Sequence, residues 1–200
     1  ISKKKTKGAK TGDLVAVKIY FWGDSEKKPE GEVVSIIGNP QDTQTLISAL
    51  LIDNGIQEKF SNEVIKEVDR IEEDFSEELE KRKDLRYLNI VTIDGADAKD
   101  LDDAVYGEKT DLGYKLYVSI ADVSYYVKEG TELDTEALKR GNSIYLVDRV
   151  IPMLPRKLSN NLCSLNPHED KLTFTVEIDF DARGKVIGND FYKSVIKSKY

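Results

Sequence analysis

The sequence predicts an α+β fold in three consecutive parts. These are the end of a small β-barrel over residues 1–40, a helical link over residues 41–83, and the first half of a mixed, mainly antiparallel sheet unit over residues 84–200. Three observations predict this order. Residues 13–19 alternate between apolar and polar side chains, apolar residues recur at helical spacing from residue 43 onward, and the chain after residue 84 is rich in strand-type segments.

Two short strands are expected in the first part, over residues 12–17 and 32–37. The residues between them, 23–31, are charged and include Pro29, so they should form a loop. Two strands alone are only marginally stable. They therefore indicate the end of a barrel whose other strands lie outside this sequence.

The helical link is expected to contain two helices. The first begins near Thr43 and closes near Gly55, with an apolar stripe of Leu46, Ala49, Leu50 and Ile56. The second follows the N-cap Ser61, and its stripe is formed by Val64, Ile65, Val68, Ile71 and Phe75. The many acidic residues of segment 63–80 indicate a solvated helix face.

The third part is expected to be built mainly from antiparallel hairpins. Residues 88–93 predict a buried strand, and residues 103–106 and 114–121 predict a hairpin across 111–113. A helix should begin at the N-cap Thr131, supported by Asp134, and end at Gly141. Residues 173–180 alternate so that their apolar side chains share one face, and a turn at 182–185 leads into a last strand that is still open at Tyr200.

Composition excludes several classes of protein. The chain has 200 residues, 40% of them hydrophobic and 34% charged, and no apolar run reaches the roughly 18–20 residues of a membrane span. One cysteine, Cys163, and one histidine, His168, exclude a disulfide framework and a multi-thiolate zinc site. Any metal should therefore be held mainly by oxygen. The single thiol and the lack of a signal peptide predict a cytoplasmic location, and the start at Ile1 suggests a segment of a longer protein.

The most informative segment is an aspartate cluster over residues 94–103, in which five aspartates fall within ten residues. Like charges at this spacing repel each other unless a cation screens them, and carboxylate oxygens suit Mg²⁺ or Mn²⁺. Asp94 should end a strand. In an extended segment Asp100 and Asp102 would face one way and Asp103 the other, so that a metal pair could be surrounded from more than one side.

Other interpretations of the cluster compete with a divalent-metal catalytic site. An EF-hand is excluded, because its required spacing of acids fits from neither Asp94 nor Asp100. An aspartyl-phosphate phosphatase could use Asp100 and Asp102, although a polar segment rather than a hydrophobic strand precedes them. A solvated acidic turn is the third possibility.

A basic strip over residues 139–157 is the second candidate site. It holds five cations and one acid, and Tyr145 lies among them. Cations interleaved with an aromatic residue suit single-stranded RNA, in which bases stack and phosphates are neutralised. A tyrosine in a strand can equally belong to the core. The net charge of −7 neither indicates nor excludes a nucleic acid, since local fields matter more than the total.

Three sequence blocks together resemble one family. They are the pattern Asp94, Asp100, Asp102 and Asp103, the segment 120–127 (IADVSYYV), and the segment 151–165 (IPMLPRKLSNNLCSL). In this order they resemble the ribonuclease II / ribonuclease R exoribonucleases, and the block over residues 94–100 favours the ribonuclease R branch. The resemblance is close over residues 84–200. Residues 10–40 are similar to the end of the family's second cold-shock domain, an OB-type barrel, and residues 41–83 to its helical link.

The resemblance implies an activity and a set of functional residues. The activity is processive hydrolytic 3′→5′ degradation of single-stranded RNA to nucleoside 5′-monophosphates, by two-metal-ion catalysis with Mg²⁺, or with Mn²⁺ in its place. Asp94, Asp100, Asp102 and Asp103 would be the metal ligands, with Asp102 and Asp103 nearest the chemistry. Tyr145 aligns with a tyrosine that stacks near the RNA 3′ end, and Arg156 would structure the site or contact a phosphate.

The resemblance also implies that parts of the enzyme lie outside this sequence. The family's downstream arginine-containing block and its C-terminal S1 domain are absent from residues 1–200. The 200-residue chain is therefore expected to be inactive on its own. The alternative function is an RNA-binding module without catalysis.

Overall fold

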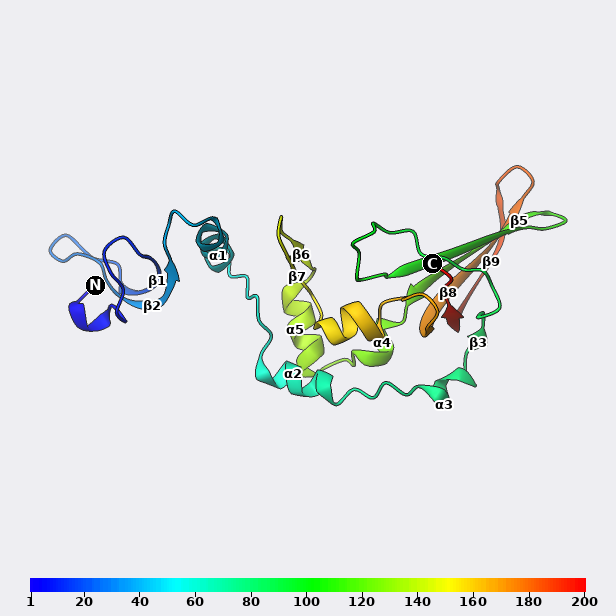
Figure 1. Cartoon of the computed structure of the whole chain (residues 1–200), viewed down its shortest axis with the longest axis horizontal. Coiled ribbons are helices and arrows are strands. Elements are labelled where there is room, and N and C mark those ends of the chain that lie inside the picture. The colour runs from blue at the N-terminus through cyan, green and yellow to red at the C-terminus, as the bar shows by residue number, and fades with distance from the viewer. The chain divides into compact units, whose positions relative to one another are not determined.

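A computed structural model describes all residues from Ile1 to Tyr200 (Figure 1). The chain forms two compact units, residues 1–59 and residues 60–200. The boundary between the units falls inside the predicted helical link. None of the helices is both long enough and apolar enough to cross a bilayer.

The first unit contains one antiparallel hairpin and one helix. After a short 3₁₀ turn η1 (Lys3–Lys5), strand β1 (Leu14–Phe21) pairs with β2 (Glu30–Gly38), and both strands are longer than predicted. These two strands do not form a closed barrel. Helix α1 (Thr43–Asp53) begins at Asp42, whose carboxylate accepts the backbone N–H of Thr45 at 3.2 Å. Gly38 is required just before this helix, because a Cβ there would lie 2.6 Å from the Thr45 hydroxyl.

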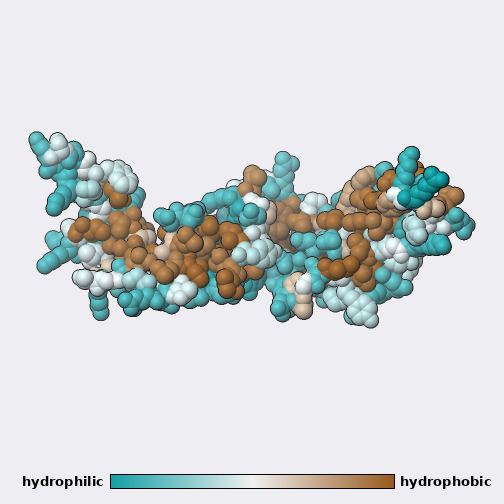
Figure 2. All heavy atoms as spheres, turned by 90° about the horizontal axis from the view of Figure 1, so that it is seen from above, coloured by the Kyte–Doolittle hydropathy of each residue, from teal (hydrophilic) through white to brown (hydrophobic).

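The apolar stripe predicted for α1 is not its buried face. Thr45 and Leu51 are buried, whereas Leu46 and Leu50 are exposed. The exposed residues line a hollow together with apolar residues of β1, and Figure 2 shows hydrophobic atoms at the surface of this unit. The predicted helix is confirmed, but helical spacing identifies an apolar stripe and not the side on which other elements cover it.

The second unit is organised around a five-stranded sheet. Its strands lie in the order β3-β9-β8-β5-β4, and their bounds are β3 (Lys83–Asp84), β4 (Asp103–Lys109), β5 (Gly113–Ala121), β8 (Asp170–Asp181) and β9 (Val186–Lys197). All neighbours are antiparallel except β3 and β9, which are parallel. The predicted mixed, mainly antiparallel sheet is confirmed. Strand β9 ends at Lys197, so the expectation of a strand still open at Tyr200 was wrong.

Short helices and a small hairpin complete the second unit. The helices are α2 (Asn62–Asp69), α3 (Ser76–Leu79), α4 (Val123–Tyr126), α5 (Glu132–Arg140) and the π-helix η2 (Leu158–Leu162), and the hairpin joins β6 (Ile144–Tyr145) to β7 (Val150–Ile151). Ser61 and Thr131 cap α2 and α5 as predicted, and Gly141 ends α5 with a positive φ of 75°. The Asp134 carboxylate accepts the N–H of Gly130.

Two predicted elements of this unit are shorter than expected. The helix after Ser61 ends at Asp69 and does not continue to Phe75, because the Lys157 ammonium binds the carbonyls of Asp69 and Ile71 where the chain leaves the helix. The strand predicted over residues 88–93 is reduced to one bridge between Val91 and Val105. These residues pack through side chains rather than through a continuous ladder, since Leu88 and Ile90 are buried.

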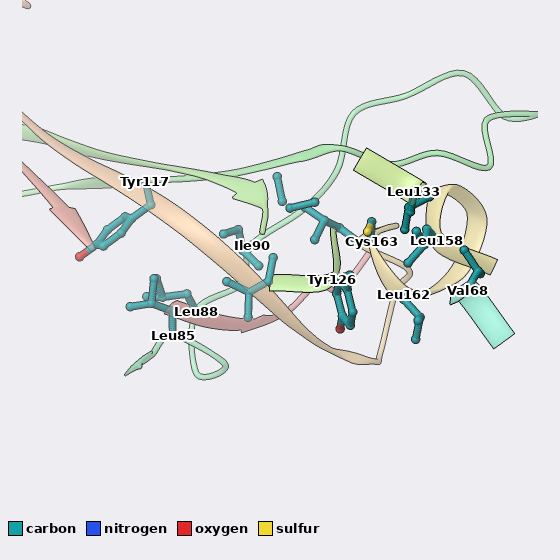
Figure 3. Close-up of a cluster of buried hydrophobic side chains, with 14 of the residues drawn as sticks. Val68, Leu85, Leu88, Ile90, Tyr117, Tyr126, Leu133, Leu158, Leu162 and Cys163 are labelled. Carbon is teal, nitrogen blue, oxygen red and sulfur yellow. The ribbon is translucent and has the colours of Figure 1, made fainter. Parts of the chain in front are cut away.

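The core of the second unit joins the sheet to the helices. Figure 3 shows Leu85, Leu88 and Ile90 near Tyr117 of β5, and Leu133, Leu158, Leu162 and Cys163 gathered near η2. On β8, the apolar alternation places Phe174, Val176, Ile178 and Phe180 on one face, but Phe174 is 43% exposed. The opposite face is the buried one, where Thr175 bonds the hydroxyls of Ser119 and Ser194.

Candidate active site

The aspartate cluster forms the loop that leads into β4. Asp94, Asp97, Asp100 and Asp102 line a cavity of about 550 Å³, which we call the carboxylate cavity. Tyr145, Arg156, Ser159 and Asn160 also line this cavity. Asp103 begins β4 and lines no part of this cavity. Asp100 and Asp102 thus face one space and Asp103 does not, as their spacing predicted.

A second, more apolar cavity adjoins the first. It has a volume of about 560 Å³ and shares Asp100, Asp102, Tyr145 and Ser159 with the carboxylate cavity. Its remaining lining includes Ile120, Val123, Met153, Leu154 and Cys163. The carboxylates therefore lie where a polar space meets an apolar one. This arrangement suits a ligand with a charged part and a flat apolar part.

Hydrogen bonds at Leu101 and Asp102 hold the loop in place. The Leu101 N–H donates to the Ser164 hydroxyl at 3.1 Å, and the Leu101 carbonyl accepts the N–H of Leu165 at 2.8 Å. The Asp102 carbonyl accepts the N–H of Ala121 at 2.9 Å. Ser164 is fully buried. The backbone between the two central carboxylates is thereby fixed to the start of the segment that follows η2.

Electrostatic repulsion is concentrated on Asp102. The protein around its carboxylate reduces hydration, and the charges of Asp100, Asp103 and Asp94 oppose ionisation, so the pKa of Asp102 lies above its ordinary value. Both causes would be relieved by a cation. The donor set consists only of carboxylates, which fits a hard divalent ion. Among residues 1–200, no three His, Cys, Asp or Glu side chains are grouped closely enough to hold an ion by themselves. Mg²⁺ usually takes one or two carboxylates and completes its shell with water and substrate oxygens.

Tyr145 belongs to the site rather than to the core. It lies in β6, is 67% exposed and lines both cavities. Its hydroxyl donates to Oδ2 of Asp100 at 2.7 Å, and this bond together with partial burial raises the pKa of Tyr145. The interpretation of Tyr145 as a core residue was therefore wrong. Its ring stays available at the cavity wall.

The basic strip is not one continuous surface. Arg156 lines the carboxylate cavity and is exposed. Lys157 binds the backbone carbonyls after α2, whereas Arg140 pairs with Glu136 at 2.8 Å and stacks on Phe60. Arg149 pairs with Asp148. Of the five cations of the strip, only Arg156 lines this cavity. Lys157 and Arg140 instead make contacts that hold other segments of the unit together.

Sequence reasoning missed several residues of the site. Asp97 was counted in the cluster but was not selected as a site residue, and Ser159, Asn160 and Ser164 carried no charge that would have drawn attention. Ser159 and Asn160 lie in the π-helix η2, a rare conformation that is frequent at functional sites. Spacing alone does not reveal a π-helix.

Both parts of the chain match known protein families. The RNB domain family model matches residues 82–200, and the Cold shock domain model matches residues 1–61. Ribonuclease R of Aquifex aeolicus (strain VF5) is 47% identical over 100% of this chain, which spans 28% of that protein. The chain thus covers little more than a quarter of that relative's length.

Solved structures are similar over nearly the whole chain. Mycoplasma genitalium RNase R in complex with double-stranded RNA matches with a TM-score of 0.94 and 35% identity, covering 99% of this chain and 36% of that one. The same enzyme in complex with ribose-methylated single-stranded RNA matches with a TM-score of 0.93 and 35% identity, covering 99% of this chain and 31% of that one. The resemblance that the motifs indicated is confirmed. Since the RNB match covers more than half of its residues, the chain belongs to the RNB domain family.

Proposed function

We propose that this chain is part of a longer exoribonuclease that degrades single-stranded RNA processively from the 3′ end and releases nucleoside 5′-monophosphates by hydrolysis. One observation carries the proposal. Four aspartates, an exposed tyrosine ring and an unpaired arginine share one cavity in a chain that is 47% identical to a ribonuclease R over its whole length. The location proposed for it is the cytoplasm, where the single buried thiol Cys163 would stay reduced.

Asp94, Asp100, Asp102 and Asp103 are the residues proposed to hold two Mg²⁺ ions, with Mn²⁺ as a substitute. When bound, such ions supply a polarised water and offset the charge that develops on the scissile phosphate and on the leaving oxygen. Asp102 is assigned to the reacting phosphate from inside the carboxylate cavity, and Asp103 from the first residue of β4, outside the lining of that cavity. Tyr145, which is not one of the proposed ligands, orients Asp100, because its hydroxyl donates a hydrogen bond to one of the two carboxylate oxygens.

The remaining residues of the cavity bind and orient RNA in this proposal. The exposed ring of Tyr145 offers a stacking surface for a base near the 3′ end. The Arg156 guanidinium supplies positive charge for a phosphate. The phosphatase alternative loses support, because Asp100 and Asp102 follow a loop rather than a buried strand.

The test uses the full-length protein and a labelled single-stranded RNA. We expect Mg²⁺-dependent release of nucleoside 5′-monophosphates, inhibition by chelator, and inhibition by a 3′-phosphate but not by a 5′ block. Residues 1–200 alone should release no nucleotide, because the family's arginine-containing block lies outside them. RNA binding without cleavage in Mg²⁺ or Mn²⁺ would instead support the RNA-binding module, and cleavage from the 5′ end would contradict the proposed polarity.

Two substitutions of Tyr145 separate its ring from its hydroxyl. In the full-length protein, Tyr145→Ala should weaken binding of short oligonucleotides by the roughly 1–3 kcal/mol of one stacked base and lengthen the final product. Tyr145→Phe keeps the ring and removes the bond to Asp100, so it should keep the product length and lower the cleavage rate. Product length is read on a sequencing gel. Unchanged products and affinity in Tyr145→Ala would exclude stacking.

A further inference from the structure

The helical segment after β7 brings two hydrogen-bond donors, Arg156 and Asn160, to the carboxylate cavity. Arg156 and Asn160 lie four residues apart in this segment, which continues into η2, and both line the cavity. Residues at this spacing lie on similar sides of a helix. The guanidinium and the amide therefore border the same space as Asp94, Asp100 and Asp102.

Both donors are free of protein partners. No hydrogen bond or ion pair holds the Arg156 guanidinium, which is exposed. The Ser159 hydroxyl donates to Oδ1 of Asn160 at 2.9 Å, which orients the amide. The Asn160 Nδ2 group then keeps both of its N–H donors, and no protein acceptor is bound to it. A half-buried amide with free donors at a cavity wall is suited to an external acceptor.

A chain of hydrogen bonds ties Asn160 to the loop that carries the carboxylates. The Leu101 N–H donates to the Ser164 hydroxyl, which donates to Oδ1 of Asn166 at 3.1 Å. The Nδ2 group of Asn166 donates to the Asn160 carbonyl at 3.3 Å. The position of Asn160 is thus coupled to the backbone between Asp100 and Asp102. Such coupling would keep a bound group at a set distance from the carboxylates.

The charge of the cavity explains why such donors are needed. Four aspartates face two cations, Lys99 and Arg156, so the space is negative before any RNA enters. A phosphodiester that approaches the carboxylates is repelled unless hydrogen-bond donors in the same cavity compensate. A guanidinium and an amide together offer a charged fork and a neutral donor for phosphate oxygens.

We propose that Arg156 and Asn160 form a clamp for one phosphodiester group of the RNA in the cavity that the carboxylates line. This inference rests on the proposed function. It adds Asn160 as a second phosphate ligand beside Arg156 and gives both residues the same phosphate. The clamp places its phosphate relative to Asp100 and Asp102 through Ser164 and Asn166.

The test compares adjacent asparagines in the full-length protein. Asn160→Asp turns the donor into an anion, whereas Asn161→Asp makes the same change at an exposed neighbour that lines neither cavity. The probe is a fluorescent oligoadenylate in chelator, where no cleavage occurs. We expect Asn160→Asp to raise Kd at least about tenfold, because a bond to a charged group is lost and repulsion is added. Asn161→Asp should stay within about twofold.

Arg156→Gln provides the second measurement, and it should leave the fold intact because the Arg156 side chain is exposed and makes no hydrogen bond or ion pair within the protein. It should lower the slope of log Kd against log salt concentration by about 1, because one fewer counterion is released when RNA binds. In an Arg156→Gln, Asn160→Ala double mutant, the fold-changes should combine to less than their product, because both residues hold one group.

The outcomes separate this inference from the proposed function. Equal Kd values for the two aspartate variants, or an unchanged salt slope in Arg156→Gln, would overturn the clamp even if the wild type degrades RNA. If the wild type binds RNA through these residues and does not cleave it, the clamp is supported and the exonuclease proposal fails. Absence of RNA binding by the wild type overturns both.

Discussion

Asp102→Asn in the full-length protein is expected to abolish RNA cleavage and to leave RNA binding unchanged or slightly tighter. The amide keeps the shape of the side chain but removes one negative charge and one strong ligand for a hard cation. The loss should exceed the roughly 10–100-fold that removal of an outer partner of a metal ligand costs. Binding should persist, because affinity for RNA comes from cationic and stacking contacts, and a carboxylate that repels phosphate is gone.

The deciding measurement pairs RNA affinity in chelator with the single-turnover rate in Mg²⁺. Asp111→Asn is the matched control, since it makes the same change at the tip of the β4–β5 hairpin, outside both site cavities. A merely structural Asp102 would give a different result, in which melting temperature, binding and turnover fall together. A rate near that of the wild type would remove Asp102 from the proposed ligand set.

Among the substitutions considered, replacement of Arg82 is expected to lower the free energy of unfolding most. The side chain of Arg82 is 0% exposed, that of Asp122 is 4% exposed, and their nearest N and O atoms lie 2.8 Å apart. Arg82 also donates to the Thr173 carbonyl at 3.3 Å. Arg82→Met leaves the Asp122 carboxylate buried with the mostly exposed Lys193 at 3.6 Å, so we expect a loss of about 3–5 kcal/mol.

The expected loss depends on pH with a definite sign. Burial opposes ionisation of Asp122, but bonds from the Ser124 hydroxyl and the Arg82 guanidinium outweigh it and hold its pKa below the ordinary value. A carboxyl with a lowered pKa in the folded state contributes stability above its unfolded pKa and loses it as pH falls through the folded pKa. The difference in the free energy of unfolding between wild type and Arg82→Met should therefore be largest near neutral pH and should decrease in acid.

The loss of stability can be measured within the larger protein as faster hydrogen exchange of the backbone amides of β5 and β8, which flank the Arg82–Asp122 pair. Arg183→Met in the exposed β8–β9 turn is the control and should change protection little. A second change, Asp122→Leu added to Arg82→Met, should restore much of the lost protection by removing the uncompensated charge. Equal protection in Arg82→Met and Arg183→Met would show that the pair contributes nothing.

Local chemistry made much of this chain predictable from sequence. The caps Ser61 and Thr131 and the positive-φ Gly141 act within one or two turns, and they lie where the sequence predicted them. The β4–β5 hairpin and the antiparallel pair β8–β9 follow from alternation and turn residues. The separation of Asp103 from Asp100 and Asp102 follows from the two-residue period of an extended chain.

Contacts between distant segments decided the rest. The sequence by itself determined where the helices α1, α2 and α5 begin, which segments form the hairpins β1–β2, β4–β5 and β8–β9, and that residues 94–103 carry concentrated negative charge. Only the tertiary structure decided that Thr173 and Thr175 are buried, that α2 ends at Asp69, and that Arg156 and Asn160 line the same cavity as the carboxylates. The physical reason is that periodicity describes one element, whereas burial and hydrogen bonding depend on which other elements pack against it.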